Sequence, residues 1–313
     1  MKKIIITEHD GGELANQLWN YVSVMSYAFE RDVDCDNWSF FEYGSFFQNL
    51  WPKNVIIRLF FRHFRHAQRR SLPRARLGRF FYKNLIARPI RKFSGKVIVS
   101  TEAEANVFYL PPTKPTFRRL AFLENQNGNA YFAQVSGAVF RNPIGLEKYR
   151  NKLIEKFKPS QKTSGKAEQV IAILHSKFSH IVGVHIRQGD FAVFKDGKFL
   201  ISQERVKEII QEYCRENNLA AEDVGFLICS DGPIDRKIFS DLNISVSQND
   251  AVTDLFSLSL CDAIVGSDST FGHFAAWYGN IPHIVMKNES INWSYYREKK
   301  DFFWNKYLTV AVI

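Results

Sequence analysis

The sequence predicts an α/β protein built on parallel sheets. Short runs of β-branched and other apolar residues alternate with helical patterns, which is typical of parallel sheets covered by helices on both faces. The length of 313 residues suits two domains of ordinary size, each with its own core. We place the boundary in the polar segment 159–168, which we expect to be a loop, so the domains should span residues 1–160 and 161–313.

The first half of the chain begins with a predicted strand and a predicted helix. Residues 3–7 are mostly apolar and β-branched, and apolar residues then recur at steps of three or four. The recurring residues are Leu14, Leu18, Val22, Met25 and Phe29. This spacing predicts one buried helix face, whereas the Asn-rich segment 125–130 is expected to be a loop.

The second half alternates more regularly. The expected strands are residues 181–185, 225–230, 263–265 and 283–286. The expected helices lie around residues 204–212, 254–260 and 271–278. Strands made of continuous apolar runs between amphipathic helices predict a parallel sheet that is buried on both faces.

The composition excludes several classes of protein. With 45% hydrophobic and 24% charged residues, the chain is neither disordered nor fibrous. The four cysteines are far apart and form no C-x-x-C pair, so we expect neither a zinc site nor disulfides, and a reducing cytoplasm fits best. No stretch approaches the roughly 18 apolar residues that span a bilayer, and the first apolar run is too short for a signal peptide. We expect a soluble or peripheral protein.

The net charge of +10 is concentrated in one segment. Residues 51–100 contain fourteen Lys and Arg and no Asp or Glu. Four arginines with spacings of 4, 3 and 4 would share one side of a helix, and apolar residues would lie opposite. The arginines are Arg58, Arg62, Arg65 and Arg69, and the apolar residues are Ile56, Phe60, Phe64 and Ala67. Two explanations stay open: contact with an anionic membrane, or a solvated arginine face over an ordinary core helix. Nucleic-acid binding is not expected, because no motif accompanies the charge.

Four polar clusters follow predicted strands, at residues 11–17, 185–190, 230–232 and 267–270. In open α/β sheets, ligands bind beyond the carboxyl ends of the strands. The clusters are therefore expected to converge on one site.

The chemistry of these clusters suits an anion. The last cluster precedes a predicted helix, whose free N–H groups and dipole favour a bound diphosphate, although Ser269 or Thr270 could simply cap the helix. Arg187 follows an apolar strand, and its guanidinium needs a bidentate anion, which either a ligand or Asp190 can supply. His185 lies on the same face of the strand, where a lone histidine is more often a core residue than a catalyst.

Other motifs are incomplete. Gly11-Gly12 does not fit G-x-G-x-x-G, which argues against a nicotinamide cofactor. Asp32-Val33-Asp34 matches the D-x-D pattern of some metal-dependent sugar transferases. Without a His or Glu partner, we interpret it as the charged edge of a strand.

Three blocks of the sequence resemble one family of enzymes. Residues 11–18 (GGELANQL) resemble a GGLGNQ signature, and residues 185–190 (HIRQGD) resemble an HxRRGD motif. Residues 254–277 resemble a block that contains NSTFSWW. These are marks of bacterial α-1,2-fucosyltransferases and, more loosely, of α-1,6- and protein O-fucosyltransferases. The region from about residue 50 to 160 resembles nothing that we can place.

The resemblance implies a GT-B fold, in which two Rossmann-like lobes face each other across a cleft. It also implies inverting, metal-independent transfer of L-fucose from GDP-fucose to a hydroxyl of a glycan, such as a cell-surface polysaccharide or a lipid-linked precursor. The N-terminal lobe would serve the acceptor and carry the basic insertion 51–100, and the C-terminal lobe would bind the nucleotide sugar. No cofactor is expected.

Roles for single residues also follow from the resemblance. Arg187 would bind the β-phosphate and stabilise the departing GDP, His185 would support the same diphosphate, and Asp231 would face the nucleoside. The remaining donor-binding residues would be Gly12, Asn16, Gln17, Ser269, Thr270 and Phe271. Asp190 and Glu13 are two candidates for the base that accepts the proton of the attacking hydroxyl.

The sequence departs from the family pattern at three places. Gln188 stands where the family often has a second arginine, Asp268 replaces an asparagine, and Gly272-His273 replaces Ser-Trp. A different donor, such as GDP-mannose, and a catalytically inactive basic binding protein therefore stay as alternatives.

Overall fold

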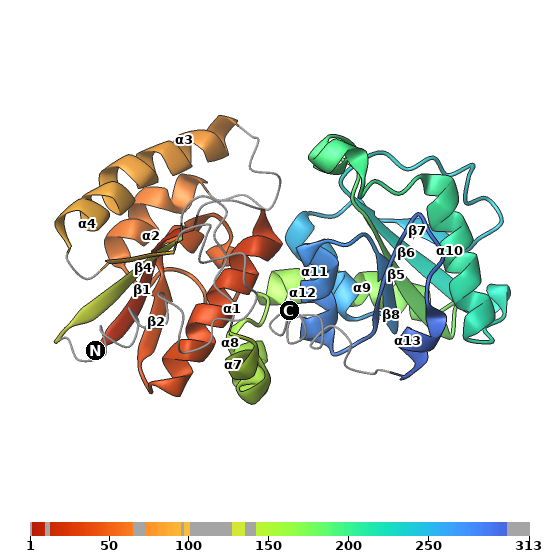
Figure 1. Cartoon of the computed structure of the whole chain (residues 1–313), viewed down its shortest axis with the longest axis horizontal. Coiled ribbons are helices and arrows are strands. Elements are labelled where there is room, and N and C mark those ends of the chain that lie inside the picture. The colour runs from red at the N-terminus through yellow and green to blue at the C-terminus, as the bar shows by residue number, and fades with distance from the viewer. Residues whose placement is uncertain are drawn as a thin grey trace. The chain divides into compact units, whose positions relative to one another are not determined.

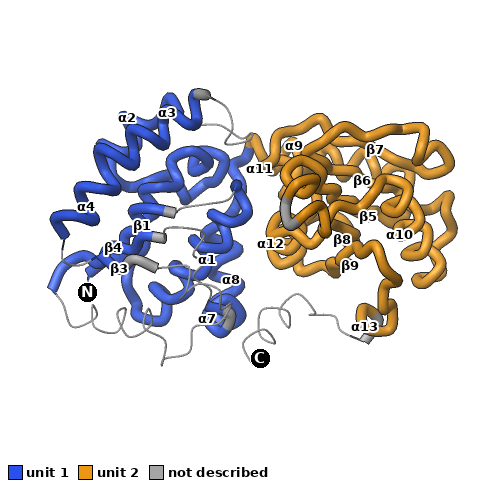
Figure 2. The backbone as a smooth tube through the Cα atoms, turned by 45° about the horizontal axis from the view of Figure 1, so that its top comes forward, with its two compact units in different colours: residues 1–161, 304–313 blue, residues 162–303 orange. Residues whose placement is uncertain are grey.

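A computed structural model describes residues 2–9, 13–64, 73–94, 97–100, 127–134 and 142–298. The chain divides into two compact units, of which the first holds Met1–Gln161 and the second Lys162–Phe303 (Figure 2). Each unit contains one parallel sheet, so the predicted fold class is confirmed.

The sheet of the first unit has four described strands in the order β2-β1-β4-β3. They are β1 (Lys3–His9), β2 (Asp34–Asn37), β3 (Val97–Ser100) and β4 (Asn129–Gln134), and all are parallel. Strand β1 is central because its apolar run Ile4–Ile6 is buried. β4 pairs with β1 from Asn129 onwards, so the expected loop at 125–130 is wrong at its last two residues.

Helices cover both faces of this first sheet (Figure 1). One face carries α1 (Leu14–Glu30), with α7 (Pro143–Lys148) and α8 (Arg150–Lys156) beside it. The predicted α1 face is confirmed except at Phe29, which is only half-buried. The other face carries α2 (Val55–Phe61), α3 (Pro73–Tyr82), a π-helical turn (Lys83–Ala87) and α4 (Arg88–Phe93).

The second unit has a five-stranded sheet in the order β7-β6-β5-β8-β9. Its strands are β5 (His180–Ile186), β6 (Val224–Ser230), β7 (Ile244–Val246), β8 (Ala263–Gly266) and β9 (His283–Val285). Its helices are α9 (Gln161–His175), α10 (Gln203–Glu216), α11 (Ala251–Ser259), α12 (Thr270–Gly279) and α13 (Trp293–Glu298). Every strand and helix expected here is present, with ends shifted by a few residues. Alternate residues of β5, such as Val182 and Val184, form a core with α10.

Two other expectations are wrong. The segment 159–168, expected as a loop, contains the start of α9, because Thr163, Ala167, Ile171 and Leu174 are buried at steps of four, four and three. The expected arginine helix is not continuous, since α2 ends at Phe61 and a 3-10 turn follows. Arg65, Arg69 and Ala67 lie outside the described residues. No helix in the described part of the chain has the length and apolar character needed to cross a bilayer.

Candidate functional site

Three polar clusters of the second unit follow three neighbouring strands. Residues 185–190, 230–232 and 267–271 lie at the carboxyl ends of β5, β6 and β8, and β5 is between the other two. The chain continues from β5 to β6 on one side and later adds β8 on the other, so the strand order reverses between β5 and β8. Ligands of open α/β sheets bind at such a switch point.

Arg187 is the cation at this switch point. Its Nε and Nη2 donate to Oδ1 and Oδ2 of Asp190 at 2.8 Å each, and its guanidinium carbon lies 5.3 Å from the centre of the Phe191 ring. The backbone N–H of Arg187 donates to Ser267 Oγ at 3.0 Å, which ties the β5 and β8 loops together. Asp190 thus supplies the bidentate anion. An exposed ion pair of this kind contributes only about 0–1 kcal/mol, so a diphosphate can compete with it.

Asp231 and Gln188 join the loops after β5 and β6. Asp231 Oδ1 accepts hydrogen bonds from the backbone N–H groups of Gln188 (2.6 Å) and Gly189 (3.1 Å). The Gln188 side chain donates to Ser230 Oγ at 3.0 Å and to the Pro233 carbonyl at 2.9 Å. At the position where the family often has a second arginine, this glutamine therefore braces the loop that carries Arg187.

His185 is buried beneath the loops. Its ring stacks on Phe271 with centroids 5.0 Å apart, and its Nδ1 has no hydrogen-bond partner among the described residues. Burial, with a smaller effect of Arg187, lowers the pKa of His185 to about 4. Its imidazole is therefore neutral near pH 7, so it can offer a diphosphate a hydrogen bond but no charge.

The start of α12 is capped by its own side chain. Ser269 precedes the helix, and its hydroxyl accepts from the backbone N–H of Phe271 at 3.3 Å, while Thr270 is the first helical residue. The chain therefore adopts the capped helix start, which was the alternative to an anion site at this motif. An anion bound here would take over the N–H of Phe271 from a hydrogen bond near the long end of the normal range.

Two of the three departures from the family pattern contact each other. His273 Nε2 lies 3.1 Å from Asp268 Oδ1, and His273 Nδ1 lies 3.1 Å from Nδ1 of His283 on β9. Gly272, which is part of the same departure as His273, makes room for this arrangement, because a Cβ there would lie 2.9 Å from His283 Nε2. The added carboxylate is therefore engaged by the added histidine. Sequence reasoning missed His283. The signal that could have indicated a changed polar cluster here was that Asp268 and His273 both replace the usual residues of the family.

Asp254 is a further titratable group that received no role from the sequence. It lies in the first turn of α11, and its Oδ1 is hydrogen-bonded to Ser247 Oγ. Burial, together with the nearby charge of Asp250, raises the pKa of Asp254 to about 7. Its place at the start of the third family-like block was the signal that could have identified it.

The first unit holds the remaining predicted residues. Glu13 precedes α1 and accepts a long hydrogen bond (3.5 Å) from Tyr43 Oη, and Asn16 is half-buried. Gln17 is fully buried, and its side-chain amide has no hydrogen-bond partner among the described residues. Leaving a buried amide without a hydrogen bond costs about 1–3 kcal/mol. An amide in this state is typical of a residue that binds a ligand. Gly12 lies outside the described residues.

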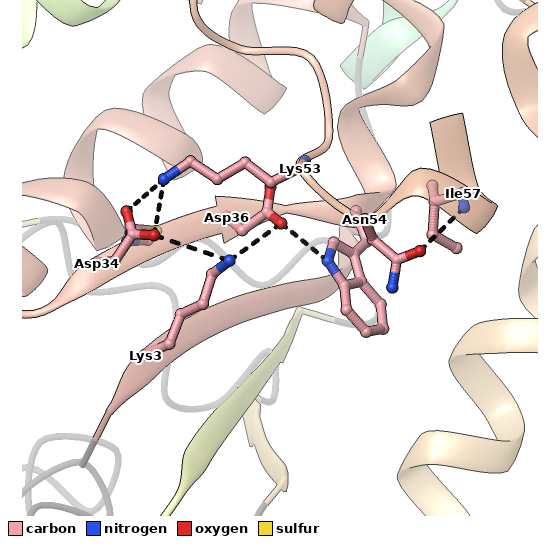
Figure 3. Close-up of polar contacts among 8 residues, drawn as sticks. Lys3, Asp34, Asp36, Lys53, Asn54 and Ile57 are labelled. Carbon is pink, nitrogen blue, oxygen red and sulfur yellow. Dashed lines mark hydrogen bonds and ion pairs between the residues drawn. The ribbon is translucent and has the colours of Figure 1, made fainter. Parts of the chain in front are cut away.

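The D-x-D segment leads into β2. Asp34 accepts from Lys53 Nζ at 2.7 and 2.8 Å and lies 3.7 Å from Lys3 Nζ, while the neighbouring Asp36 is 3.4 Å from Lys3 (Figure 3). Lysine contacts therefore neutralise Asp34, as expected for a charged strand edge. Asp32 lies in the turn before β2, with a positive φ of 50°.

Solved fucosyltransferase structures have a similar fold. A mutant of Arabidopsis thaliana FUT1 in complex with GDP matches with a TM-score of 0.51 and 15% identity, over 92% of this chain and 71% of that chain. POFUT1 in complex with GDP matches with a TM-score of 0.53 and 14% identity, over 91% and 98%. POFUT1 in complex with GDP-fucose matches with a TM-score of 0.50 and 12% identity, over 91% and 97%. No protein-family model and no curated protein sequence matches the chain. The likeness confirms a GT-B fold with two Rossmann-like units.

Proposed function

We propose that this protein is an inverting glycosyltransferase that transfers L-fucose from GDP-fucose to a hydroxyl of a glycan acceptor. The observation that carries the proposal is the position of Arg187, at the β5/β8 switch point of a fold shared with GDP-bound fucosyltransferases. A guanidinium binds two phosphate oxygens in the geometry that it now uses for Asp190.

The proposed chemistry depends on charge stabilisation and positioning. As the bond between fucose and GDP breaks, negative charge grows on the leaving diphosphate, and Arg187 stabilises it most in the transition state. The neutral imidazole of His185 adds a hydrogen bond. We propose that this transfer needs no metal, because the guanidinium supplies the positive charge.

Binding of the diphosphate also changes the contacts of a candidate base, Asp190. When phosphate oxygens replace Asp190 on the guanidinium, its carboxylate, whose side chain is 58% exposed, becomes able to accept the proton of the attacking hydroxyl. Glu13 of the first unit is the second candidate for the base. Asn16 and the buried amide of Gln17 are proposed to bind the donor or acceptor sugar.

The test is calorimetric titration in EDTA with GDP, GDP-fucose, GDP-mannose and UDP-glucose, followed by turnover with a panel of glycan acceptors. We expect selective binding of GDP and GDP-fucose. Arg187→Ala should bind more weakly and lower kcat by about a hundredfold or more, the usual cost of a lost leaving-group contact. Arg215→Ala is the matched control, because this exposed arginine lies in the last turn of α10. Near-normal turnover of Arg187→Ala would contradict the proposal.

A second candidate function uses another donor. The contact between Asp268 and His273 changes the charge and shape of a segment that the family-like motif places at the donor. Selective binding of GDP-mannose in the same titration would favour that function. Binding of GDP-fucose without turnover on any acceptor would instead favour an inactive binding protein.

We also propose a cytoplasmic location. All four cysteines, Cys35, Cys214, Cys229 and Cys261, are free thiols and buried. This arrangement suits a reducing compartment. Thiol titration of the protein purified from its source cells would contradict the proposal if it revealed disulfides.

A further inference from the structure

We propose that the helices α2, α3 and α4 form a docking surface for the anionic surface of a lipid bilayer. This lipid face, as we call the described residues 55–64 and 73–93, gathers most of the exposed large apolar side chains of the described chain, nine of fourteen. The nine are Val55, Ile56, Leu59, Phe60, Leu77, Phe80, Phe81, Leu85 and Phe93. Exposed apolar groups at this density mark an interaction site.

The apolar side of α2 is not packed into the core, although one of the two open explanations required this. Ile56 and Phe60, expected opposite the arginines, are 72% and 58% exposed, whereas Ile57 and Phe61 are buried. Arg58 is also exposed. The apolar and basic side chains therefore emerge together into solvent. Mixed exposure of this kind is typical of helices that lie in a membrane interface, where arginine heads reach the lipid phosphates and apolar groups enter the acyl boundary.

A line of aromatic rings connects α2 with α3. The ring centroids are 5.3 Å apart for Phe60 and Phe61, 6.0 Å for Phe61 and Phe64, 6.5 Å for Phe64 and Phe81, and 5.9 Å for Phe81 and Phe80. These contacts link the exposed rings of the two helices through the buried Phe61 and the half-buried Phe64.

Much of the positive charge on the lipid face is available to a partner. Arg79 pairs with Glu42, and Lys83 and Arg91 contact Glu8. Five other cations are exposed and form no ion pair with the described residues, namely Arg58, Arg74, Arg76, Arg88 and Lys92. Residues 51–100 contain no Asp or Glu, so the carboxylates that reach this face, Glu8 and Glu42, come from other segments of the first unit.

The lipid face has a rigid support. Asn54 caps α2 by accepting from the N–H of Ile57, and the preceding Lys53 is held by Asp34 (Figure 3). Beneath the face, a buried cluster that includes Phe41 and Tyr82 packs the helices together. The surface is therefore presented by folded helices, so little ordering cost opposes docking.

A lipid surface explains the composition better than a nucleic acid does. Phosphate contacts account for the arginines, but the aliphatic groups of Ile56, Leu59 and Leu85 have no use in a nucleic-acid groove. In a bilayer, the same groups add apolar burial to the electrostatic attraction.

The docking surface is also connected to β1, the strand that precedes the first family-like motif. Tyr82 Oη donates to the Thr7 carbonyl at 2.7 Å, and Arg91 reaches Glu8, so the lipid face is anchored at the carboxyl end of β1. Docking would bring this end of β1 close to the membrane. A consequence that depends on the proposed function is that the acceptor is linked to a lipid; docking itself does not depend on it.

Flotation of the full chain with vesicles tests the proposal. The vesicles contain either phosphatidylcholine alone or an equal mixture with phosphatidylglycerol. One variant reverses four charges of the lipid face (Arg58→Glu, Arg74→Glu, Arg76→Glu and Arg88→Glu), and a second removes four apolar groups (Ile56→Ser, Phe60→Ser, Phe80→Ser and Phe93→Ser). The control reverses four exposed charges of the second unit (Lys162→Glu, Lys166→Glu, Lys177→Glu and Arg215→Glu). Circular dichroism and urea unfolding check that each variant is folded.

We expect flotation with the mixed vesicles only. Because each basic residue at an anionic surface strengthens binding about fivefold, the charge-reversed variant should partition at least about a hundredfold more weakly. The apolar variant should also lose binding, and the control should float like the wild type. Equal flotation of wild type and both lipid-face variants would overturn the proposal. Two other results would also overturn it. In one, the wild type does not float but binds an oligonucleotide tightly. In the other, the wild type does not float and forms a dimer that only the apolar variant loses.

Discussion

Asp268 is the residue whose negative charge is least expected beside a diphosphate. Its partner His273 holds it at 3.1 Å, and an asparagine could keep this hydrogen bond without the charge. Since like charges repel by about 1 kcal/mol at 4 Å in water, Asp268→Asn should strengthen GDP binding about fivefold at low salt. Calorimetry measures the change. The control Asp223→Asn removes a carboxylate next to the amino end of β6 and should leave affinity unaltered. Equal affinity in all three proteins would place Asp268 away from the nucleotide.

His185, which is buried, and Asp254, which is half-buried, should have opposite effects on how stability depends on pH. The pKa of His185 is lowered to about 4, so unfolding takes up a proton between about pH 4 and 6.5, and stability rises with pH in that window. The pKa of Asp254 is raised to about 7, so unfolding releases a proton between about pH 4 and 7, and stability falls. These effects are about 3 and 4 kcal/mol, and they largely cancel in the wild type.

Single variants should separate the two effects. His185→Gln should lose stability as the pH rises from about 4 to 7, and Asp254→Asn should gain it. Urea unfolding at several pH values measures both profiles. If each variant changes with pH in parallel to the wild type, the shifted pKa values are contradicted.

At the scale of elements, the fit of α12 against β9 depends on one glycine. A Cβ at Gly272 would lie 2.9 Å from His283 Nε2 and 3.6 Å from His185 Nδ1, so Gly272→Ala should destabilise the fold by about 1–3 kcal/mol. Gly165 of α9 is the matched control, because a Cβ there meets nothing within 4 Å. Gly165→Ala should stabilise by about 0.5–1 kcal/mol. Urea unfolding measures both, and two shifts of the same sign would contradict the argument.

The elements of the second unit were predictable because their strands are continuous apolar runs, as in β5 and β6, and such runs exclude most alternatives. The start of α9 was not predictable, because the polar residue Thr163 occupies a buried position and interrupts the helical spacing of apolar residues. Polar residues at both ends of β4 concealed that strand in the same way. Contacts between side chains of different elements, such as the contact of His273 with His283, depend on tertiary packing, which a local sequence pattern does not predict.

The candidate site was predictable to the level of its loops. The rule that ligands bind beyond carboxyl strand ends brought the motifs of β5, β6 and β8 together. The rule does not predict which polar groups form hydrogen bonds or ion pairs with each other within the protein. The contacts Arg187–Asp190 and Ser269–Phe271 were alternatives that the sequence left open, and the structure contains both. The bracing of the loop by Gln188 emerged only from the structure.

At the scale of the whole molecule, the cysteines report on the two units separately. Cys35 belongs to the first unit, and Cys214, Cys229 and Cys261 belong to the second. Burial raises the pKa of each thiol, so none should react quickly in the native protein. Pulsed thiol labelling across a urea titration, read by mass spectrometry, then follows each unit through its own unfolding.

Because each unit has a sheet and core of its own, we expect one label at one urea midpoint and three at another. A ligand stabilises the unit that binds it, by about 2.7 kcal/mol at a hundred times its Kd. GDP should therefore shift the midpoint of the three-thiol group more than that of Cys35, and Arg187→Ala should abolish the difference. A shift confined to Cys35 would place the nucleotide in the first unit, and four thiols labelled at a single midpoint would mean that the units unfold together.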